Sequence, residues 1–296
     1  MKKHNFSAGP AILPKEVIKG AADAVLELDN IGLSLIEISH RSPEFKAIME
    51  EACDLALELL GLEGKGYKAM YLQGGASMQF LMTAYNMLQT KAGYVNSGTW
   101  STKAIKEAKI LGDVMELASS KDKNFNYIPK GFEIPNDLDY LHITTNNTIY
   151  GTQYKELPKT NVPLVADMSS DIFSRPLDYS KFDLFYAGAQ KNIGPSGVTL
   201  VVIKETAFNK VNRVIPSMLN YEVQSNSGSM FNTPPVFPVY TVLLNLRWIA
   251  KNGGLKGVGA KNDKKSALIY DEIDRNPLFE GFANTDDRSS MNATFN

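Results

Sequence analysis

A lysine follows an apolar run in the segment LFYAGAQKNIGPSG, residues 184–197. The run predicts a strand that ends near Ala187 and leads Gln190 and Lys191 into a glycine-rich loop. Partial removal of water from a lysine amine at such a position lowers its pKa, and the neutral amine can then form a Schiff base with a carbonyl compound. Taken alone, the pattern is better explained by an ordinary surface lysine in a turn.

An aspartate ends a second apolar run, VPLVADMSS, residues 162–170. Asp167 and Lys191 are 191 − 167 = 24 residues apart, which is room for one further strand with its connections. We therefore expect both side chains at the same edge of a sheet, where parallel strands end. Such a pair suits pyridoxal phosphate, because a carboxylate beside the pyridine nitrogen keeps the ring protonated and able to accept electrons. An aspartate at a strand end can instead cap a helix, so the pair is more specific than either residue.

A glycine turn in MYLQGGASMQF, residues 70–80, predicts a strand that passes directly into a helix. The first turn of a helix has free N–H groups and a partial positive charge, and glycines let a phosphate approach the backbone closely. Many α/β proteins contain such a turn, so the motif is weak alone. Beside Lys191 and Asp167, it predicts that Ala76 and Ser77 hold the cofactor phosphate.

Other polar and aromatic residues follow predicted strands or stiff loops. Trp100, in NSGTWS, can stack on a pyridine ring, although packing in the core is the commoner role of an isolated tryptophan. Thr148, in TTNNTIYG, can donate a hydrogen bond to the hydroxyl of that ring. Asn232 and Thr233, in GSMFNTPP, have the polarity to contact phosphate from a loop stiffened by prolines.

The segment ISHRSPEF places His40 and Arg41 directly before a predicted helix. Arginine is suited to bidentate recognition of a carboxylate or phosphate group. A surface arginine near a helix start is otherwise common, so the functional interpretation depends on the other motifs.

Helices and short apolar strands must alternate to position these residues. Residues 42–60 have a capping Ser42, a proline in the first turn and one apolar stripe, which predict a helix that Gly61 ends. Further helices are expected after Pro14, after Ser77 and after Trp100, and over residues 238–251 and 263–274. Strands are expected over residues 69–72, 94–96, 141–144, 162–166, 184–187 and 198–203. This alternation predicts an α/β fold with a mostly parallel sheet between helices.

The glycine-rich residues 253–259 are the expected boundary of a smaller C-terminal domain. We assign residues 15–257 to the large domain, and residues 1–14 together with 258–296 to an α+β small domain.

Composition restricts the class of protein. The chain has 296 residues, 44% hydrophobic and 21% charged, with a net charge of −1, so nothing suggests nucleic-acid binding. It has one cysteine, no apolar run long enough to span a bilayer, and an N-terminus unlike an export signal. We expect a cytoplasmic protein with neither a membrane anchor nor a metal site.

The motifs AGAQKNIGPSG, GSMFNTPP, SHRSPEF and NFSAGP occur together in one chain. In this combination the sequence resembles the phosphoserine aminotransferases, which are pyridoxal-phosphate enzymes of fold type I in the class-V aminotransferase group. The resemblance covers essentially all 296 residues, and the first two motifs are its most specific part.

The resemblance implies a role for each candidate residue. Lys191 binds the cofactor covalently, Asp167 pairs with the pyridine nitrogen and Trp100 stacks on the ring. The cofactor site is completed by Ala76, Ser77, Thr148 and Gln190. Asn232 and Thr233 reach the cofactor phosphate of a neighbouring subunit, which implies a homodimer with shared sites, and Arg41 with His40 binds the substrate anion.

The implied reaction moves an amino group between glutamate and 3-phosphohydroxypyruvate, a phosphorylated 2-oxo acid, on the route to serine. A related 4-phosphohydroxythreonine substrate, on the route to pyridoxine, also fits.

Family members continue beyond the segment RSSMNATFN and carry there a Gly-His-Arg element for substrate anions, which this sequence lacks. The resemblance therefore implies an incomplete small domain, and poorer turnover of phosphorylated substrates than an extended chain would show. Two alternatives remain: another fold-type-I enzyme, or a catalytically impaired fragment that only binds the cofactor.

Overall fold

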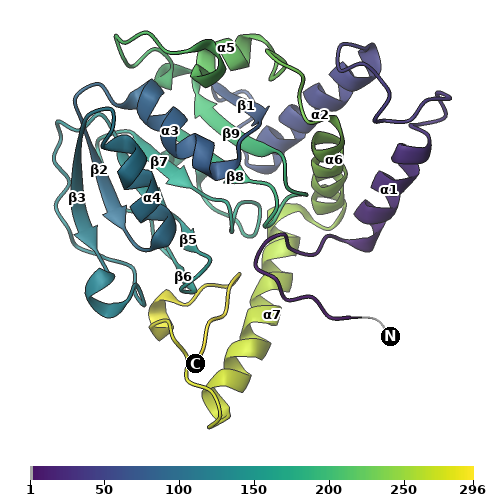
Figure 1. The fold of residues 1–296 in the computed structure, drawn as a ribbon. Coiled ribbons are helices and arrows are strands. Elements are labelled where there is room, and N and C mark those ends of the chain that lie inside the picture. The colour runs from purple at the N-terminus through teal and green to yellow at the C-terminus, as the bar shows by residue number, and fades with distance from the viewer. Residues whose placement is uncertain (1–2) are drawn as a thin grey trace.

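The computed structural model describes residues 3–296 and has a seven-stranded sheet at its centre (Figure 1). Across the sheet the strand order is β1-β9-β8-β7-β4-β2-β3. The strands are β1 (Tyr67–Leu72), β2 (Lys91–Asn96), β3 (Asp113–Ser119), β4 (Leu141–Thr144), β7 (Leu164–Asp167), β8 (Leu184–Gly188) and β9 (Thr199–Lys204). A separate hairpin, β5 (Asn146–Asn147) and β6 (Thr152–Gln153), follows β4.

Seven α-helices lie within residues 3–296. They are α1 (Lys15–Leu26), α2 (Pro43–Leu59), α3 (Gly75–Met87), α4 (Thr99–Ala108), α5 (Tyr221–Asn226), α6 (Val236–Lys251) and α7 (Gly254–Arg275). In this part of the chain, no helix has both the length and the apolar character needed to cross a membrane.

The sheet is parallel except at β9, which runs antiparallel to its neighbours β8 and β1. Its register aligns the carboxyl ends of several strands. Leu72 at the end of β1 and Gly188 at the end of β8 both pair with Thr199, and Asp167 at the end of β7 pairs with Tyr186. The predicted α/β class with a mostly parallel sheet is confirmed, and the loops after these strands leave from one edge.

Helices cover both faces of the sheet, which explains why β7 and β8 are buried at every residue. Alternate side chains of β8 enter different cores. Phe185 and Ala187 pack in the core that includes residues of α1, α2 and α6, whereas Leu184 and Tyr186 pack in the core that includes residues of α3 and α4. Figure 1 shows α1, α2 and α6 grouped on one side of the molecule and α3 and α4 on the other.

The predicted helix over residues 42–60 is observed as α2. Its start is stabilised by Ser42, whose hydroxyl accepts a hydrogen bond from the N–H of Phe45 at 3.4 Å, and by Pro43 at the first position. The buried residues of the helix are Phe45, Ile48, Met49, Ala52 and Ala56, which belong to the expected apolar stripe.

The observed elements differ from the sequence-based expectations at several places: α5 and the hairpin β5–β6 were not predicted, and β3 and α7 also differ. Strand β3 is absent from the expected set because Asp113 and Glu116 interrupt its apolar residues; it lies at the sheet edge, where only β2 pairs with it. Helix α7 begins at Gly254 rather than at residue 263, so the expected boundary at residues 257/258 falls inside a continuous helix. The division into two domains stays a prediction. Residues 1–2, which were assigned to the small domain, lie outside the described residues.

A buried asparagine anchors the C-terminal segment to the sheet edge. The Asn146 side-chain amide donates to Ser170 Oγ and to Asn292 Oδ1, both at 2.8 Å, and its carbonyl oxygen accepts a hydrogen bond from the Ser289 hydroxyl. Asn146, Ser170 and Ser289 are each at most 5% exposed. Residues 289–292 are therefore connected to the loop that follows Asp167 by a buried polar network.

Replacing Asn146 should loosen this segment. Asn146→Ala leaves buried partners unsatisfied, at a cost of about 1–3 kcal/mol for each such group. We expect faster amide hydrogen exchange in residues 289–296, measured by mass spectrometry. Asn161→Ala, at an exposed asparagine that bonds Asn136 at 3.4 Å, is the control. Equal exchange in the two variants would show that Asn146 is not the anchor.

Candidate active site

The Lys191 amine lies between a hydroxyl and an aromatic ring. Its Nζ donates a hydrogen bond to Thr148 Oγ1 at 2.6 Å and lies 4.9 Å from the centroid of the Trp100 ring. Lys191 is partly buried, in a turn after β8 in which the N–H of Gly194 bonds the carbonyl of Ala189 at 2.8 Å. Burial lowers the pKa of the amine, and the negative charge of Asp167 opposes this shift. The site thus favours a neutral lysine more than water does.

Asp167 occupies the last position of β7 and is 4% exposed. One carboxylate oxygen, Oδ1, accepts hydrogen bonds from the Ser169 N–H at 2.9 Å and the Ser169 hydroxyl at 2.6 Å. Burial raises the pKa of Asp167, while the Lys191 cation and the Ser169 hydrogen bonds oppose the rise. Within residues 3–296, Oδ1 of Asp167 therefore accepts two hydrogen bonds, whereas Oδ2 accepts none.

Thr148 and Trp100 come from separate segments, which the Asn147 side chain joins by contacting the backbone just before α4. Thr148 lies in the turn between β5 and β6, and Trp100 in the first turn of α4. The Asn147 side chain donates to the carbonyl of Ser97, just before α4. A Cβ atom at Gly98 would lie 1.8 Å from Asn147 Nδ2, so only glycine permits this approach.

The predicted phosphate-binding turn begins helix α3. Its N-cap, Gly74, has a φ of 93° and provides no side-chain cap, and the first helical positions include Ala76 and Ser77. Among residues 3–296, no acceptor takes the N–H groups of Ala76 and Ser77. Since β1 ends level with β8, these N–H groups belong to the same sheet edge as Lys191.

Asn232 and Thr233 lie beside this turn. Asn232 Nδ2 donates to Gln73 Oε1 at 3.1 Å, and Gln73 Nε2 donates to the carbonyl of Thr233 at 3.0 Å. Gly74 and Asn232 also line a cavity of about 230 Å³. The structure therefore places the GSMFNTPP and glycine-turn motifs in contact within one chain.

The N-terminal segment also approaches Lys191, although its sequence motif suggested no role for it. The N–H of Ala11 donates to the carbonyl of Gln190 at 2.9 Å. A Cβ atom at Gly9 would lie 2.9 Å from Lys191 Cγ. The Gly-Pro pair of NFSAGP could have indicated a close backbone approach at this segment. No local pattern, however, shows that the partner is the loop carrying Lys191.

His40 and Arg41 are not brought to the lysine within this chain. They lie in the segment between α1 and α2, where Arg41 is exposed and His40 partly buried. Within residues 3–296, neither side chain makes a hydrogen bond or an ion pair, so their role as anion binders stays a prediction.

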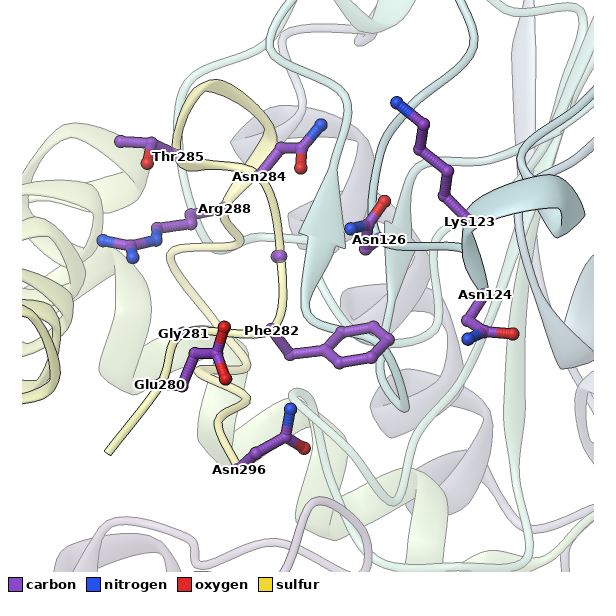
Figure 2. A pocket seen from close by; sticks show the side chains of 11 residues that line it. Lys123, Asn124, Asn126, Glu280, Gly281, Phe282, Asn284, Thr285, Arg288 and Asn296 are labelled. Carbon is purple, nitrogen blue, oxygen red and sulfur yellow. The ribbon is translucent and has the colours of Figure 1, made fainter. Parts of the chain in front are cut away.

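A different hollow, of about 590 Å³, lies between the C-terminal segment and residues near Lys123 (Figure 2). It contains none of the predicted site residues. Its one arginine, Arg288, turns towards α7 and pairs with Asp274 through two contacts of 2.6 Å. This hollow is therefore separate from the sheet edge that carries Lys191 and Asp167.

The groups around Lys191 match the needs of pyridoxal phosphate. A lysine amine of lowered pKa, a hydroxyl and an indole lie together with a carboxylate oxygen and helix-start N–H groups that have no hydrogen-bond partner within residues 3–296. With a mostly parallel sheet between helices, they define the class as pyridoxal-phosphate-dependent enzymes of fold type I.

Comparison with known proteins narrows this class. The pattern of the family described as aminotransferase class-V matches residues 3–296. A phosphoserine aminotransferase of Flavobacterium johnsoniae is 61% identical over 297 residues, covering 100% of this chain and 83% of the relative. One of Bacteroides fragilis is 55% identical over 295 residues, with the same coverage. The chain belongs to the phosphoserine aminotransferase family.

Solved structures agree with this assignment. The phosphoserine aminotransferase of Bacillus circulans subsp. alkalophilus superimposes with a TM-score of 0.95 at 45% identity, over 98% of this chain and 82% of that one. The pyridoxal-phosphate-bound enzyme of Trichomonas vaginalis gives a TM-score of 0.94 at 32% identity, over 99% and 84%. Pyridoxal phosphate is therefore the cofactor of this chain, as the sequence predicted.

The charge of Asp167 should set the pH at which Lys191 becomes reactive. Because Asp167 raises the Lys191 pKa against the lowering by burial, Asp167→Asn should lower that pKa further. We expect acetylation of Lys191 in the cofactor-free protein, followed by peptide mapping across pH, to reach its midpoint at a lower pH in the variant. Asp137→Asn, a surface change, should leave the midpoint in place, and a midpoint that stays or rises in Asp167→Asn would contradict the coupling.

Proposed function

We propose that this chain transfers the amino group of glutamate to 3-phosphohydroxypyruvate, giving 2-oxoglutarate and phosphoserine for serine biosynthesis. The Lys191–Asp167 pair at one sheet edge carries the proposal structurally, and the phosphoserine aminotransferase relatives support the choice of reaction. A second phosphorylated substrate, 4-phosphohydroxythreonine, and a cytoplasmic location are parts of the same proposal.

Pyridoxal phosphate, when bound, supplies a carbonyl carbon for amine exchange and a ring that accepts the electron pair left when the substrate Cα–H bond breaks. Lys191 would hold the cofactor through its amine until the substrate amine displaces it. The released amine would then act as the base that moves the proton from the substrate Cα to the cofactor. Its lowered pKa favours the neutral form that this transfer requires.

The remaining residues orient the reacting groups. Asp167 would hold a proton on the ring nitrogen, Thr148 would bind the ring hydroxyl and Trp100 would cover the ring face. Ala76 and Ser77 would bind the phosphate through their N–H groups, with Gln190 completing the site. These assignments require no rearrangement of the strands, because all of these groups leave from the same sheet edge.

A homodimer with shared active sites is the proposed assembly. Thr233 is exposed and Asn232 partly so, and within residues 3–296 their hydrogen bonds are to Gln73 and to each other, not to Lys191. They are thus available to contact the cofactor phosphate bound by a second copy. Arg41 and His40 would bind the substrate anion, and the large domain (residues 15–257) would bind the cofactor largely without the small one.

Removing the Lys191 amine should abolish the reaction. Lys191→Ala should lose covalent cofactor binding, seen as loss of both the visible absorbance and the borohydride-fixed adduct. Turnover of glutamate with 3-phosphohydroxypyruvate should fall by more than the 10²–10⁴-fold, in round figures, typical of losing a general base, because the covalent role is lost too. Lys106→Ala, on the exposed face of α4, should behave as wild type. An adduct retained by Lys191→Ala would refute the assignment of the lysine.

The choice of acceptor is tested on the wild-type protein. Faster turnover of a non-phosphorylated acceptor than of 3-phosphohydroxypyruvate would favour another fold-type-I activity.

Shared sites predict complementation between inactive subunits. Lys191→Ala subunits and Asn232→Ala/Thr233→Ala subunits should each be inactive, yet exchange should pair an intact lysine with an intact phosphate loop in some sites. We expect activity to appear after mixing, with exchange verified by native mass spectrometry. No recovered activity in verified mixed dimers would contradict a shared site.

A further inference from the structure

Ser169 joins the ends of the two strands that carry the reacting groups. Its hydroxyl donates to Asp167 Oδ1 at 2.6 Å and accepts a hydrogen bond from the N–H of Gly188 at 3.1 Å. Gly188 is the last residue of β8, directly before the segment that carries Lys191. Ser169 is 4% exposed, so water does not compete freely for either bond.

The contacts of Ser169 also fix which way the Asp167 carboxylate turns. The Ser169 N–H and hydroxyl both bond the same oxygen, Oδ1. The backbone beneath is held by the N–H of Met168, which donates to the carbonyl of Tyr186 at 2.8 Å. Because two donors bond Oδ1, the carboxylate has little freedom to rotate. Its other oxygen, Oδ2, can then accept a hydrogen bond from another donor.

We propose that Ser169 is a positioning residue that holds the Asp167 carboxylate with Oδ2 turned to the pyridine nitrogen of the cofactor. This inference rests on the proposed function. Ser169 does not react itself; it keeps Asp167 ionised and oriented while tying it to the strand that leads to Lys191. Without its hydroxyl, the carboxylate loses a charge-assisted hydrogen bond and the Gly188 N–H loses its acceptor.

The direction of the effect follows from the same hydrogen bond. Donation from Ser169 opposes the rise that burial causes in the pKa of Asp167. A carboxylate that loses this donor binds a proton more readily, so it competes better with the ring nitrogen for the proton between them. Ser169→Ala should therefore make the bound cofactor ring less protonated.

The chain provides a matched control in the next residue. Ser170 is also buried, at 5% exposed, but its hydroxyl bonds Asn146, donating to the backbone carbonyl at 2.9 Å and accepting from the side-chain amide at 2.8 Å, and makes no bond to Asp167. Ser170→Ala thus removes a buried hydroxyl of the same loop without changing the carboxylate. Ser169→Thr keeps the hydroxyl and tests rescue.

The test uses holoenzyme loaded with pyridoxal phosphate labelled with ¹⁵N in the ring. In the wild type and in Ser170→Ala, we expect the ¹⁵N chemical shift of a protonated ring across the neutral range of pH. In Ser169→Ala the shift should move towards that of the neutral ring. The kcat should also fall about tenfold or more, as expected for one charge-assisted hydrogen bond, with little change in the KM for glutamate. Ser169→Thr should restore both values.

Two results would overturn the inference: a wild-type ring signal in Ser169→Ala, or the same change in Ser170→Ala. Failure of the proposed function is distinguishable, because the wild-type protein itself would then fail to bind the labelled cofactor or to transfer the amino group.

Discussion

Asp167 ends β7, and Lys191 lies in the turn after the neighbouring strand β8, so both side chains are partly or fully removed from water. The attraction between their opposite charges lowers the free-energy cost of burying each one. Burial alone would favour a neutral carboxyl group and a neutral amine. Their mutual attraction opposes both shifts, so the protonation of the site depends on the pair. The lowered pKa of Lys191 favours the neutral amine, which is the form in which an amine acts as a nucleophile or a base.

The parallel arrangement of β7 and β8 makes this pair possible. Because parallel neighbours end at the same edge, Asp167 and the loop carrying Lys191 project together without long connections. The single antiparallel strand, β9, lies between β8 and β1 and aligns the end of β1 with that edge as well. The start of α3, whose N–H groups can bind phosphate, therefore lies at the same sheet edge as Lys191 and Asp167.

The loops at this edge are held by buried polar contacts rather than by an apolar core. Asn147 connects the turn containing Thr148 to the start of α4 across Gly98, and Asn146 connects the same hairpin to the C-terminal segment. Ser169 adds the link between the two strand ends. Buried hydrogen bonds are directional, so they fix the orientation of a catalytic side chain more closely than apolar packing does.

The sequence by itself determined the chemical types at the strand ends and the elements that carry them. Lys191 and Asp167 could be singled out because each follows a short apolar run, and α2 because its cap, first-turn proline and apolar stripe are local signals. The exposed-edge strand β3 and the glycine-containing start of α7 lacked such signals, so the sequence did not predict them. The family resemblance supplied roles for residues such as Asn232 whose local pattern is weak.

Only the tertiary structure decided which of these residues meet. Thr148 bonds Lys191 across 43 positions of sequence, and Gly9 lies against the same lysine from the other end of the chain. The tertiary structure also keeps Arg41 away from the residues around Lys191 and places Asn232 beside Gln73. Local patterns report the backbone preference and burial of short segments, whereas contacts of this kind depend on sheet order, register and close backbone approaches that form only when the whole chain packs.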